Sequence, residues 1–397
     1  MHSASDVRAR AMGLERIDTH GHIDVRVPDL AEVAAGLTQF DNCGSLMTAK
    51  LYAVGCRELY GIDVGTYLRP DPPAELLARA AEFRAGGDRA AFERGLDAAH
   101  ISRMLVFCDH RPARSALLSL SSRLHLLAYI DPAILGSFAA YSPDFPLEGY
   151  CHYDKLCEQF DRALDSFDDY LSALDEAVDS WRAHGVVGMK TAMAYTTGLF
   201  FADPPLDDAR AAFRKRREMT LADAMTVKDY AFRRALLACK RNGLPVVIHT
   251  GFQIWGHASL SQANPMLLHN LLIDSRYRDL TFVLLHGGNP YVGETTYLAG
   301  MFPNVIIDFT WISWMTRARF RLALAEWLEV VPHDRFCWGS DTSAAPENVA
   351  GINYIVREEI ANVLEDQIAR RVIDERIALE FLGNTYLNTP RRAFGLG

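Results

Sequence analysis

Eight short apolar runs recur along this chain, and most of them are separated by stretches long enough to form a helix. Such an alternation is typical of repeated β-α units, which build a parallel sheet. Eight units of this kind close into a (β/α)8 barrel. We therefore predict an α/β fold of the TIM-barrel type. The predicted strands are 16–22, 101–108, 125–130, 186–190, 245–250, 280–286, 305–309 and 335–341.

The stretches between the runs carry recognisable helix boundaries. Thr220 and Asp223 form a capping-box pattern at the start of a helix predicted over 220–242, and Gly243 with Pro245 ends it before the next strand. The stretch 170–185 has apolar residues at helical spacing and stops at a glycine directly before another predicted strand. These boundaries support the alternation of strand and helix.

Two connections are too long for ordinary loops, so both must contain structure of their own. They span residues 24–100, after the first strand, and 135–170, after the third. The first is rich in helix-forming residues, and we predict mostly helical insertions that cover one end of the barrel. No linker or internal repeat divides the sequence, so we predict a single domain over 1–397.

Charge and cysteine usage exclude several classes of protein. The net charge of −9, with acidic and basic residues mixed along the chain, disfavours binding to nucleic acid or to an anionic membrane. The seven cysteines are scattered and include no C-x-x-C pair, which indicates reduced thiols rather than disulfides or a thiolate zinc site. No stretch reaches the ~18 apolar residues of a membrane span, and the first residues lack the apolar core of a signal peptide. We expect a soluble cytoplasmic protein.

Residues that can bind metal stand at the ends of the predicted strands, which converge on one face of such a barrel. They are His20, His22, Lys190, His249, His286 and Asp341. His20 and His22 are two residues apart, so both imidazoles point to the same side of the strand and can bind one ion. Any one histidine at a strand end is more often structural, but the whole set in this order indicates a metal site. Three nitrogen ligands and one carboxylate suit a divalent metal, zinc first, with manganese or iron as alternatives.

These residues lie in the motifs D-T-H-G-H, G-M-K, V-I-H-T-G, L-L-H-G-G and W-G-S-D. In this order the chain resembles the amidohydrolase superfamily, in its amidohydrolase-related branch, over nearly the whole length. The stretches HTGF, NPMLLHNLL and LLHGGNPYV are especially similar to a domain that some plant and fungal proteins carry fused to a glutamine-synthetase-like domain.

The resemblance implies that His20, His22, His249 and Asp341 hold a metal. It implies that His286 either binds a second ion or acts beside the first as acid, base or electrostatic helper. Lys190 is either a carbamylated bridge between two ions or a residue that binds a substrate anion or forms an ion pair. One ion and two ions are therefore both open, and a homo-oligomer is expected from the resemblance alone.

The ligand set and the resemblance favour a metal-dependent hydrolase that acts on an amide, lactam or ester carbonyl of a small molecule. A divalent ion acidifies water and polarises a carbonyl. Asp341 is expected to take the proton of the attacking water, and Asp341 or His286 to return it to the leaving group. A decarboxylase or a uronate-type isomerase of the same superfamily would need the same metal and stays open. A non-catalytic regulatory barrel is disfavoured, because a buried cluster of this kind without metal has no favourable protonation state.

Further residues are candidates for substrate contacts. We predict that Lys190, Tyr195 and Trp311 bind substrate, with Trp314 as a second part of an aromatic wall. Arg210 is a weaker candidate to reach a substrate carboxylate.

Three other residues are expected to act indirectly or not at all. Asp18 precedes the paired histidines and is expected either to orient one of them or to cap the strand. His257 and His269 are expected to be structural or surface histidines.

Overall fold

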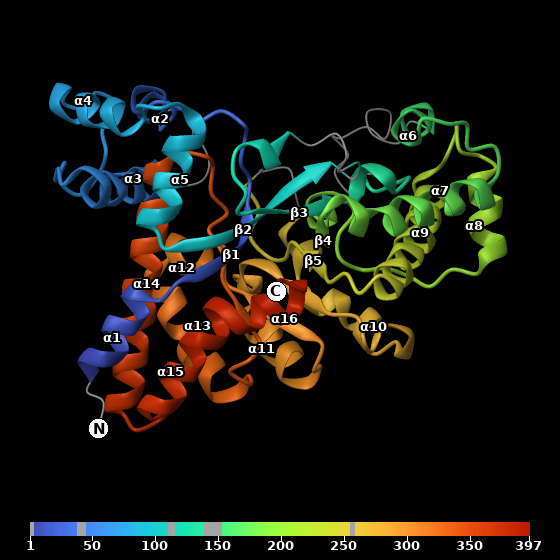
Figure 1. Cartoon of the computed structure of the whole chain (residues 1–397). Coiled ribbons are helices and arrows are strands. Elements are labelled where there is room, and N and C mark those ends of the chain that lie inside the picture. Colours follow the sequence, from blue (N-terminus) through green and yellow to red (C-terminus); the bar gives the residue numbers. More distant parts are fainter. Residues whose placement is uncertain (1–3, 38–44, 110, 112–115, 139–152, 255–258) are drawn as a thin grey trace.

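The computed structural model describes residues 4–37, 45–109, 111, 116–138, 153–254 and 259–397. Its centre is an eight-stranded sheet in which each strand pairs in parallel with the next strand of the chain (Figure 1). The strands are β1 (Arg16–Gly21), β2 (Ile101–Asp109), β3 (Leu124–Tyr129), β4 (Val186–Thr191), β5 (Val246–Ile248), β6 (Phe282–Leu284), β7 (Val305–Asp308) and β8 (Phe336–Cys337). Each of them overlaps one predicted strand.

The sheet closes on itself between β1 and the segment that follows β8. The backbone N–H of Thr19 donates to the carbonyl of Trp338 at 3.1 Å, and that of His22 donates to Thr342 at 2.9 Å. The prediction of a (β/α)8 TIM barrel is confirmed. The eighth strand is shorter than the predicted 335–341, because the chain beyond it leaves the regular ladder while it keeps these bonds to β1.

The barrel interior is filled by one aliphatic or thiol side chain from each strand, as expected for a closed barrel of this size. These residues are Ile17, Leu105, Leu127, Val187, Val247, Val283, Ile306 and Cys337. Phe394 and Leu396, from the last residues of the chain, pack against this layer. Because this layer fills the barrel toward the end where the strands begin, the polar side chains at the ends of the strands meet on the other side of it, where the strands finish.

The first predicted insertion consists of helices. They are α2 (Leu30–Gly36), α3 (Ser45–Tyr60), α4 (Ala74–Phe83) and α5 (Asp88–Ala98). Figure 1 shows them gathered on one side of the barrel, next to the long helix α14 (Pro346–Ala369).

Two glycines let α3 and α14 approach each other closely. A Cβ at Gly55 would lie 2.0 Å from the carbonyl oxygen of Glu347, and one at Gly351 would lie 1.9 Å from that of Leu51. Arg84 adds a bidentate ion pair to the buried Glu347 carboxylate, with both N–O distances at 2.8 Å. The insertion is thereby fixed to the helix that begins just after β8.

The second insertion lies partly outside the described residues. After β3 come the short turn η3 (Asp131–Ala133) and then, beyond the gap at 139–152, the helices α6 (Tyr153–Phe160) and α7 (Phe167–Ser180). Helix α7 connects to β4, so the predicted limit of 170 runs a few residues into that helix. The described part of this insertion is helical, as predicted.

The capping-box prediction is confirmed at α9 (Leu221–Arg241), where Thr220 Oγ1 accepts from the backbone N–H of Asp223 at 3.2 Å. The other α-helices are α1 (Ala4–Gly13), α8 (Leu206–Phe213), α10 (His269–Leu272), α11 (Val292–Met301), α12 (Ile312–Met315), α13 (Arg317–Val330), α15 (Glu375–Gly383) and α16 (Thr389–Phe394). Within the described ranges, no helix combines the length and apolarity that a membrane crossing requires. Cys43 and Cys151 lie outside the described residues.

Candidate metal and active site

Three of the predicted ligands come together where β1 ends and β8 is followed by a loop. Nε2 of His20 lies 3.6 Å from Oδ1 of Asp341, and Nε2 of His22 lies 3.3 Å from the same oxygen. One ligand atom from each residue lies within 4.8 Å of the others. His20 and the Asp341 side chain are buried, whereas the His22 side chain is 53% exposed. We call these three residues the β1/β8 trio; it opens to solvent at His22.

Backbone contacts between β1 and the loop after β8 hold the trio in place. The N–H of Asp341 donates to the carbonyl of His20 at 2.7 Å. Oδ1 of Asp18 accepts from the N–H of His20 at 3.1 Å and from that of Ser340 at 2.9 Å. A Cβ at Gly339 would lie 2.5 Å from Cβ of His20, so only glycine permits this approach. Asp18 thus positions the backbone of His20 and, through Ser340, the loop that carries Asp341.

The chemistry of the trio fits a divalent cation. Burial, together with the positive charge of Lys190, lowers the pKa of His20 well below its usual value, so the imidazole is neutral and can offer a lone pair. Burial raises the pKa of Asp341, and the neighbouring carboxylates of Asp18 and Asp308 add to this. A cation at this position would compensate the buried negative charge. Two imidazoles and a carboxylate are ligands that zinc, manganese and iron accept.

The other two predicted histidines form a separate pair at the ends of β5 and β6, which we call the β5/β6 pair. Nε2 of His249 lies 2.8 Å from the carbonyl oxygen of Phe252 and must donate to it. Nδ1 of the neutral His249 ring then has only a lone pair, and it accepts from Nε2 of His286 at 3.0 Å. Both ring nitrogens of His249 are therefore engaged. The pair is adjacent to the trio, with the ring centroids of His286 and His20 6.0 Å apart.

Lys190 lies buried between these two groups. Its Nζ lies 4.7 Å from the ring centroid of Phe107, which also contacts the ring of His20. Burial lowers the pKa of Lys190, and the carboxylates of Asp341, Asp131 and Asp308 oppose the shift. Its charge in turn lowers the pKa of every histidine in the trio and the pair. Lys190 is thus the electrostatic centre of the described site.

Sequence reasoning missed two buried carboxylates near Lys190. Asp308, the last residue of β7, accepts from the N–H of Thr310 at 2.9 Å and from the hydroxyl of Thr19. Asp131 follows β3 and accepts from the N–H of Ala192 at 2.9 Å; burial raises its pKa to about 6. Both could have been found by the rule that selected Lys190, because each is a polar residue at the end of an apolar run.

Aromatic rings line the β5/β6 side of the site. The Trp311 indole stacks on the His286 ring with centroids 4.2 Å apart, and the Tyr195 ring lies 4.5 Å from that of His249. Both predicted substrate-binding aromatics therefore lie at the site. Trp314 instead donates from Nε1 to the carbonyl of Ser340 at 3.2 Å and braces the loop after β8.

Three residues of the site have backbone angles that side chains rarely adopt. The φ angles are 67° at His286, 60° at Trp311 and 53° at Asp341. Each such conformation costs of order 1 kcal/mol or more and persists where the surrounding structure enforces it. This concentration of strain at one end of the barrel is typical of a functional site.

The remaining candidates lie elsewhere. Arg210 is on α8, where it pairs with Asp168 at 2.9 Å on the surface, so it does not reach the site. His269 packs against Phe302 with ring centroids 5.7 Å apart, as expected for a structural residue. His257 lies outside the described residues.

Comparison with known proteins identifies the family. The amidohydrolase family model matches residues 168–374, which is just over half of the 397 residues. The chain belongs to the amidohydrolase family. It is also similar to the protein FluG of Emericella nidulans, with 29% identity over 225 residues, or 53% of this chain. The match covers 25% of FluG, so this amidohydrolase corresponds to only a part of that relative.

Solved structures show the same fold at low sequence identity. A candidate metal-dependent hydrolase from Lactobacillus casei ATCC 334 has 19% identity and a TM-score of 0.73, over 98% of this amidohydrolase and 97% of that chain. A uronate isomerase from Thermotoga maritima has 13% identity and a TM-score of 0.77, again over 98% and 97%. A uronate isomerase from Bacillus halodurans has 14% identity and a TM-score of 0.73, over 100% and 98%. The shared architecture therefore spans the entire barrel.

Proposed function

We propose that this amidohydrolase is a metal-dependent hydrolase that adds water to an amide, lactam or ester carbonyl of a small molecule. The observation that carries the proposal is the β1/β8 trio: His20, His22 and Asp341 converge at the end of the barrel where such enzymes have their active sites. Two imidazoles and a carboxylate suit zinc, manganese or iron, and we propose zinc as the preferred ion.

In this proposal His20 and His22, whose Nε2 atoms face Asp341, would hold the ion together with that carboxylate. A divalent ion bound there supplies polarisation of the carbonyl and acidification of water. Asp341 would contribute a carboxylate oxygen to the ion, and its carboxylate would accept the proton of the attacking water and return it to the leaving group. His286, whose ring lies beside that of His20, is the second candidate to deliver this proton.

We further propose that the trio holds a single ion. A second ion would need ligands from the β5/β6 side, but the Nδ1 lone pair of His249 already accepts a hydrogen bond from His286. Burial lowers the pKa of Lys190 to about 7, while the carboxylates of Asp341, Asp131 and Asp308 and the ring of Phe107 favour its ammonium form. In this interpretation Lys190 balances charge and attracts an anionic group of the substrate, whereas a carbamylated bridge would require it to be neutral first.

Substrate selection follows from the same surroundings. Trp311 and Tyr195, on the β5/β6 side, offer ring faces for a planar or apolar part of the substrate. The exposed side of His22 gives the substrate access to the trio.

Isomerisation of a uronate is the second candidate, because two structural relatives are uronate isomerases and Lys190 could bind a sugar carboxylate. The two functions are separated by assaying metal-loaded protein on a panel of lactams, amides and esters and, in parallel, on D-glucuronate. The proposal predicts release of an acid from at least one carbonyl substrate and no ketose from the uronate. Ketose formation without any hydrolysis would overturn it in favour of the isomerase.

A further inference from the structure

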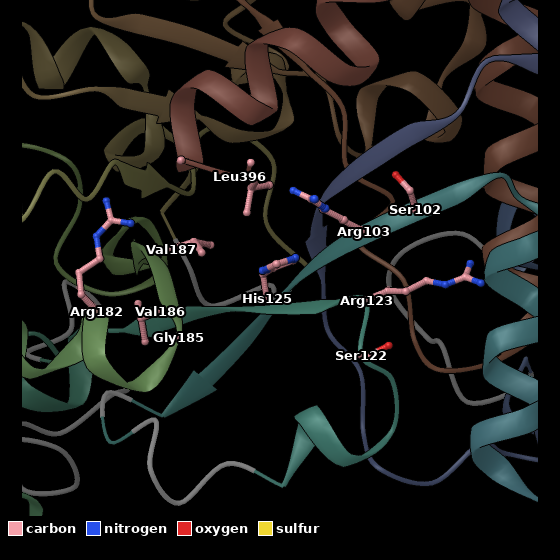
Figure 2. A pocket seen from close by; sticks show the side chains of 12 residues that line it. Ser102, Arg103, Ser122, Arg123, His125, Arg182, Gly185, Val186, Val187 and Leu396 are labelled. Atoms are coloured by element: carbon pink, nitrogen blue, oxygen red, sulfur yellow. The ribbon is translucent and has the colours of Figure 1, made fainter.

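A cavity lies at the end of the barrel opposite the candidate metal site, where the strands begin. It has a volume of about 480 Å³ and is bounded by the first residues of β2, β3 and β4 and by the last residues of the chain (Figure 2). This size is in the range of ordinary small-molecule sites. The packed interior layer, which includes Leu127 and Val187, separates it from the metal site.

The lining of this cavity is basic in an acidic protein. Its lining residues include Arg103, Arg123, Arg182 and His125 and no aspartate or glutamate side chain, although the chain carries a net charge of −9. Gly397, the last residue of the sequence, also lines the cavity and bears a single carboxylate. The positive charge is therefore concentrated locally against the average of the molecule. Such a pocket attracts anions.

The three arginines differ in how their charge is used. Arg123 forms ion pairs with Glu93 at 3.0 Å and Asp97 at 2.5 Å, and Figure 2 shows its side chain extending away from the cavity toward α5. Among the residues that the structure describes, no carboxylate lies within 4.0 Å of the guanidinium of Arg103 or Arg182. Arg123 is thus neutralised, and the other two are not.

Arg103 and Arg182 flank the cavity with hydrogen-bonding groups to spare. Arg182 donates from Nε to the carbonyl of Asn242 at 3.1 Å and from one terminal nitrogen to that of Gly243 at 2.6 Å, so it is held in place by neutral acceptors only. Arg103 follows the inward alternation of β2, two residues before Leu105 of the interior layer. In Figure 2 its guanidinium lies beside Leu396 and above the His125 ring.

His125 adds a third polar group. Burial and the charge of Arg103 together lower its pKa, so the two groups are close enough to interact. A neutral imidazole can donate one hydrogen bond to an anion bound by the arginines. Val187 and Leu396, which belong to the packed interior layer, give the cavity an apolar floor.

We propose that this cavity binds a small organic anion through Arg103, Arg182 and His125. The anion carries a carboxylate or a phosphate group, because planar guanidinium groups recognise both by bidentate hydrogen bonds. An apolar portion of the same molecule rests on Val187 and Leu396. The site is separate from the metal centre and does not depend on the proposed hydrolysis.

Isothermal titration calorimetry of the full chain at low ionic strength tests the proposal, with inorganic phosphate and succinate as the two probes. We expect at least one probe to bind, and the stronger of the two tells whether the site prefers a phosphate or a carboxylate. Arg103→Gln should weaken binding about tenfold, because one charged donor is lost. Arg89→Gln, an exposed arginine of α5 away from the cavity, removes the same charge and should leave the affinity unchanged.

Arg182→Gln is a second variant and should also weaken binding, and thermal melting reports whether each variant is folded. Phosphate and succinate can also bind to a metal ion. A loss of affinity on substitution of Arg103 or Arg182 therefore distinguishes binding in this cavity from binding at the metal site. The proposal is wrong if neither probe binds the wild type, or if folded Arg103→Gln and Arg182→Gln bind both probes as tightly as Arg89→Gln.

Discussion

The two sides of the candidate metal site use the same residue types in different ways. On the β1/β8 side, two imidazoles face one carboxylate with their Nε2 atoms, and the group opens to solvent at His22. On the β5/β6 side, both ring nitrogens of His249 form hydrogen bonds, one to the Phe252 carbonyl and one with His286. The rings of Tyr195 and Trp311 pack against the His249 ring. A histidine whose lone pair already accepts a hydrogen bond is not a ready metal ligand, and His286, which donates that bond, remains the candidate for proton delivery. We therefore assign metal binding to the trio and proton handling to the pair.

The largest effect is expected at Asp341, which belongs to the trio and is the proposed acceptor of the water's proton. Asp341→Asn keeps the shape but removes the basic oxygen, so kcat should fall by about 10³-fold. Steady-state assays on a substrate identified with the proposed panel of carbonyl compounds would measure it. Asp24→Asn, an exposed aspartate close after β1, is the matched control and should retain full activity. Near-normal turnover by Asp341→Asn would remove this residue from the mechanism.

The next largest effect is expected on stability, from substitution of Lys190, which lies between the two sides. In the metal-free protein, Lys190→Met leaves Asp341, Asp131 and Asp308 without their buried cation, and the free energy of unfolding should fall by about 3 kcal/mol. Urea denaturation measures this change. When the variant is prepared with metal, its metal content should equal that of the wild type, with or without bicarbonate. A loss of metal in the variant would instead support a carbamylated bridge.

The hydrogen bond within the β5/β6 pair should appear as coupling between its members. His249→Asn and His286→Asn should each lower kcat, and the double variant should lose less than the sum, with a coupling of about 1 kcal/mol. A double-mutant cycle on kcat gives this value. Strict additivity would show that the two rings act independently.

The smallest effect concerns the helix that leads into β5. Asp223 caps α9, and hydrogen bonds from Lys215 and Thr220 hold its pKa down, to about 2. Asp223→Ala should reduce stability by about 1 kcal/mol at neutral pH without changing metal content.

The pH dependence of this effect has a definite sign. Because the folded pKa of Asp223 is depressed, its stabilisation is complete above the unfolded value of ~3.9 and is lost as the pH falls through about 2. Thermal melting of wild type and variant should therefore converge at low pH. Asp208→Ala, in the first turn of α8 where no side chain caps the helix, should show a smaller difference. Equal effects of the two substitutions would contradict the role of the capping box.

Much of the barrel could be predicted because apolar runs and capping signals are local. The placement of individual site residues is less local. Val283 and Leu285 of the β6 region face the interior, so strict alternation would turn His286 outward; its left-handed backbone brings it to the site instead. In β4, Val187 and Lys190 are three positions apart, so strict alternation would place them on opposite faces of the sheet. A register shift beside Val187 lets both side chains point into the barrel.

The division of the ligands into a trio and a pair could not be predicted from sequence. The five residues stand at equivalent strand ends, and nothing in their spacing shows that His249 finds Phe252 and His286 as partners. Such contacts depend on the turn after β5, whose path is set by tertiary packing. Arg210 is a further example. Its pairing with Asp168 on the surface also depends on contacts remote in sequence, and it keeps Arg210 away from the site.

Metal content per chain tests the central claim most directly. Elemental analysis would be made on protein purified without chelators, for wild type, His22→Ala and His249→Asn. We predict one ion per chain in the wild type, its loss in His22→Ala and its retention in His249→Asn. Retention is expected because the lone pair of the wild-type His249 already accepts a hydrogen bond from His286. Two ions in the wild type, or loss of metal in His249→Asn with retention in His22→Ala, would contradict the assignment of the metal to the β1/β8 trio.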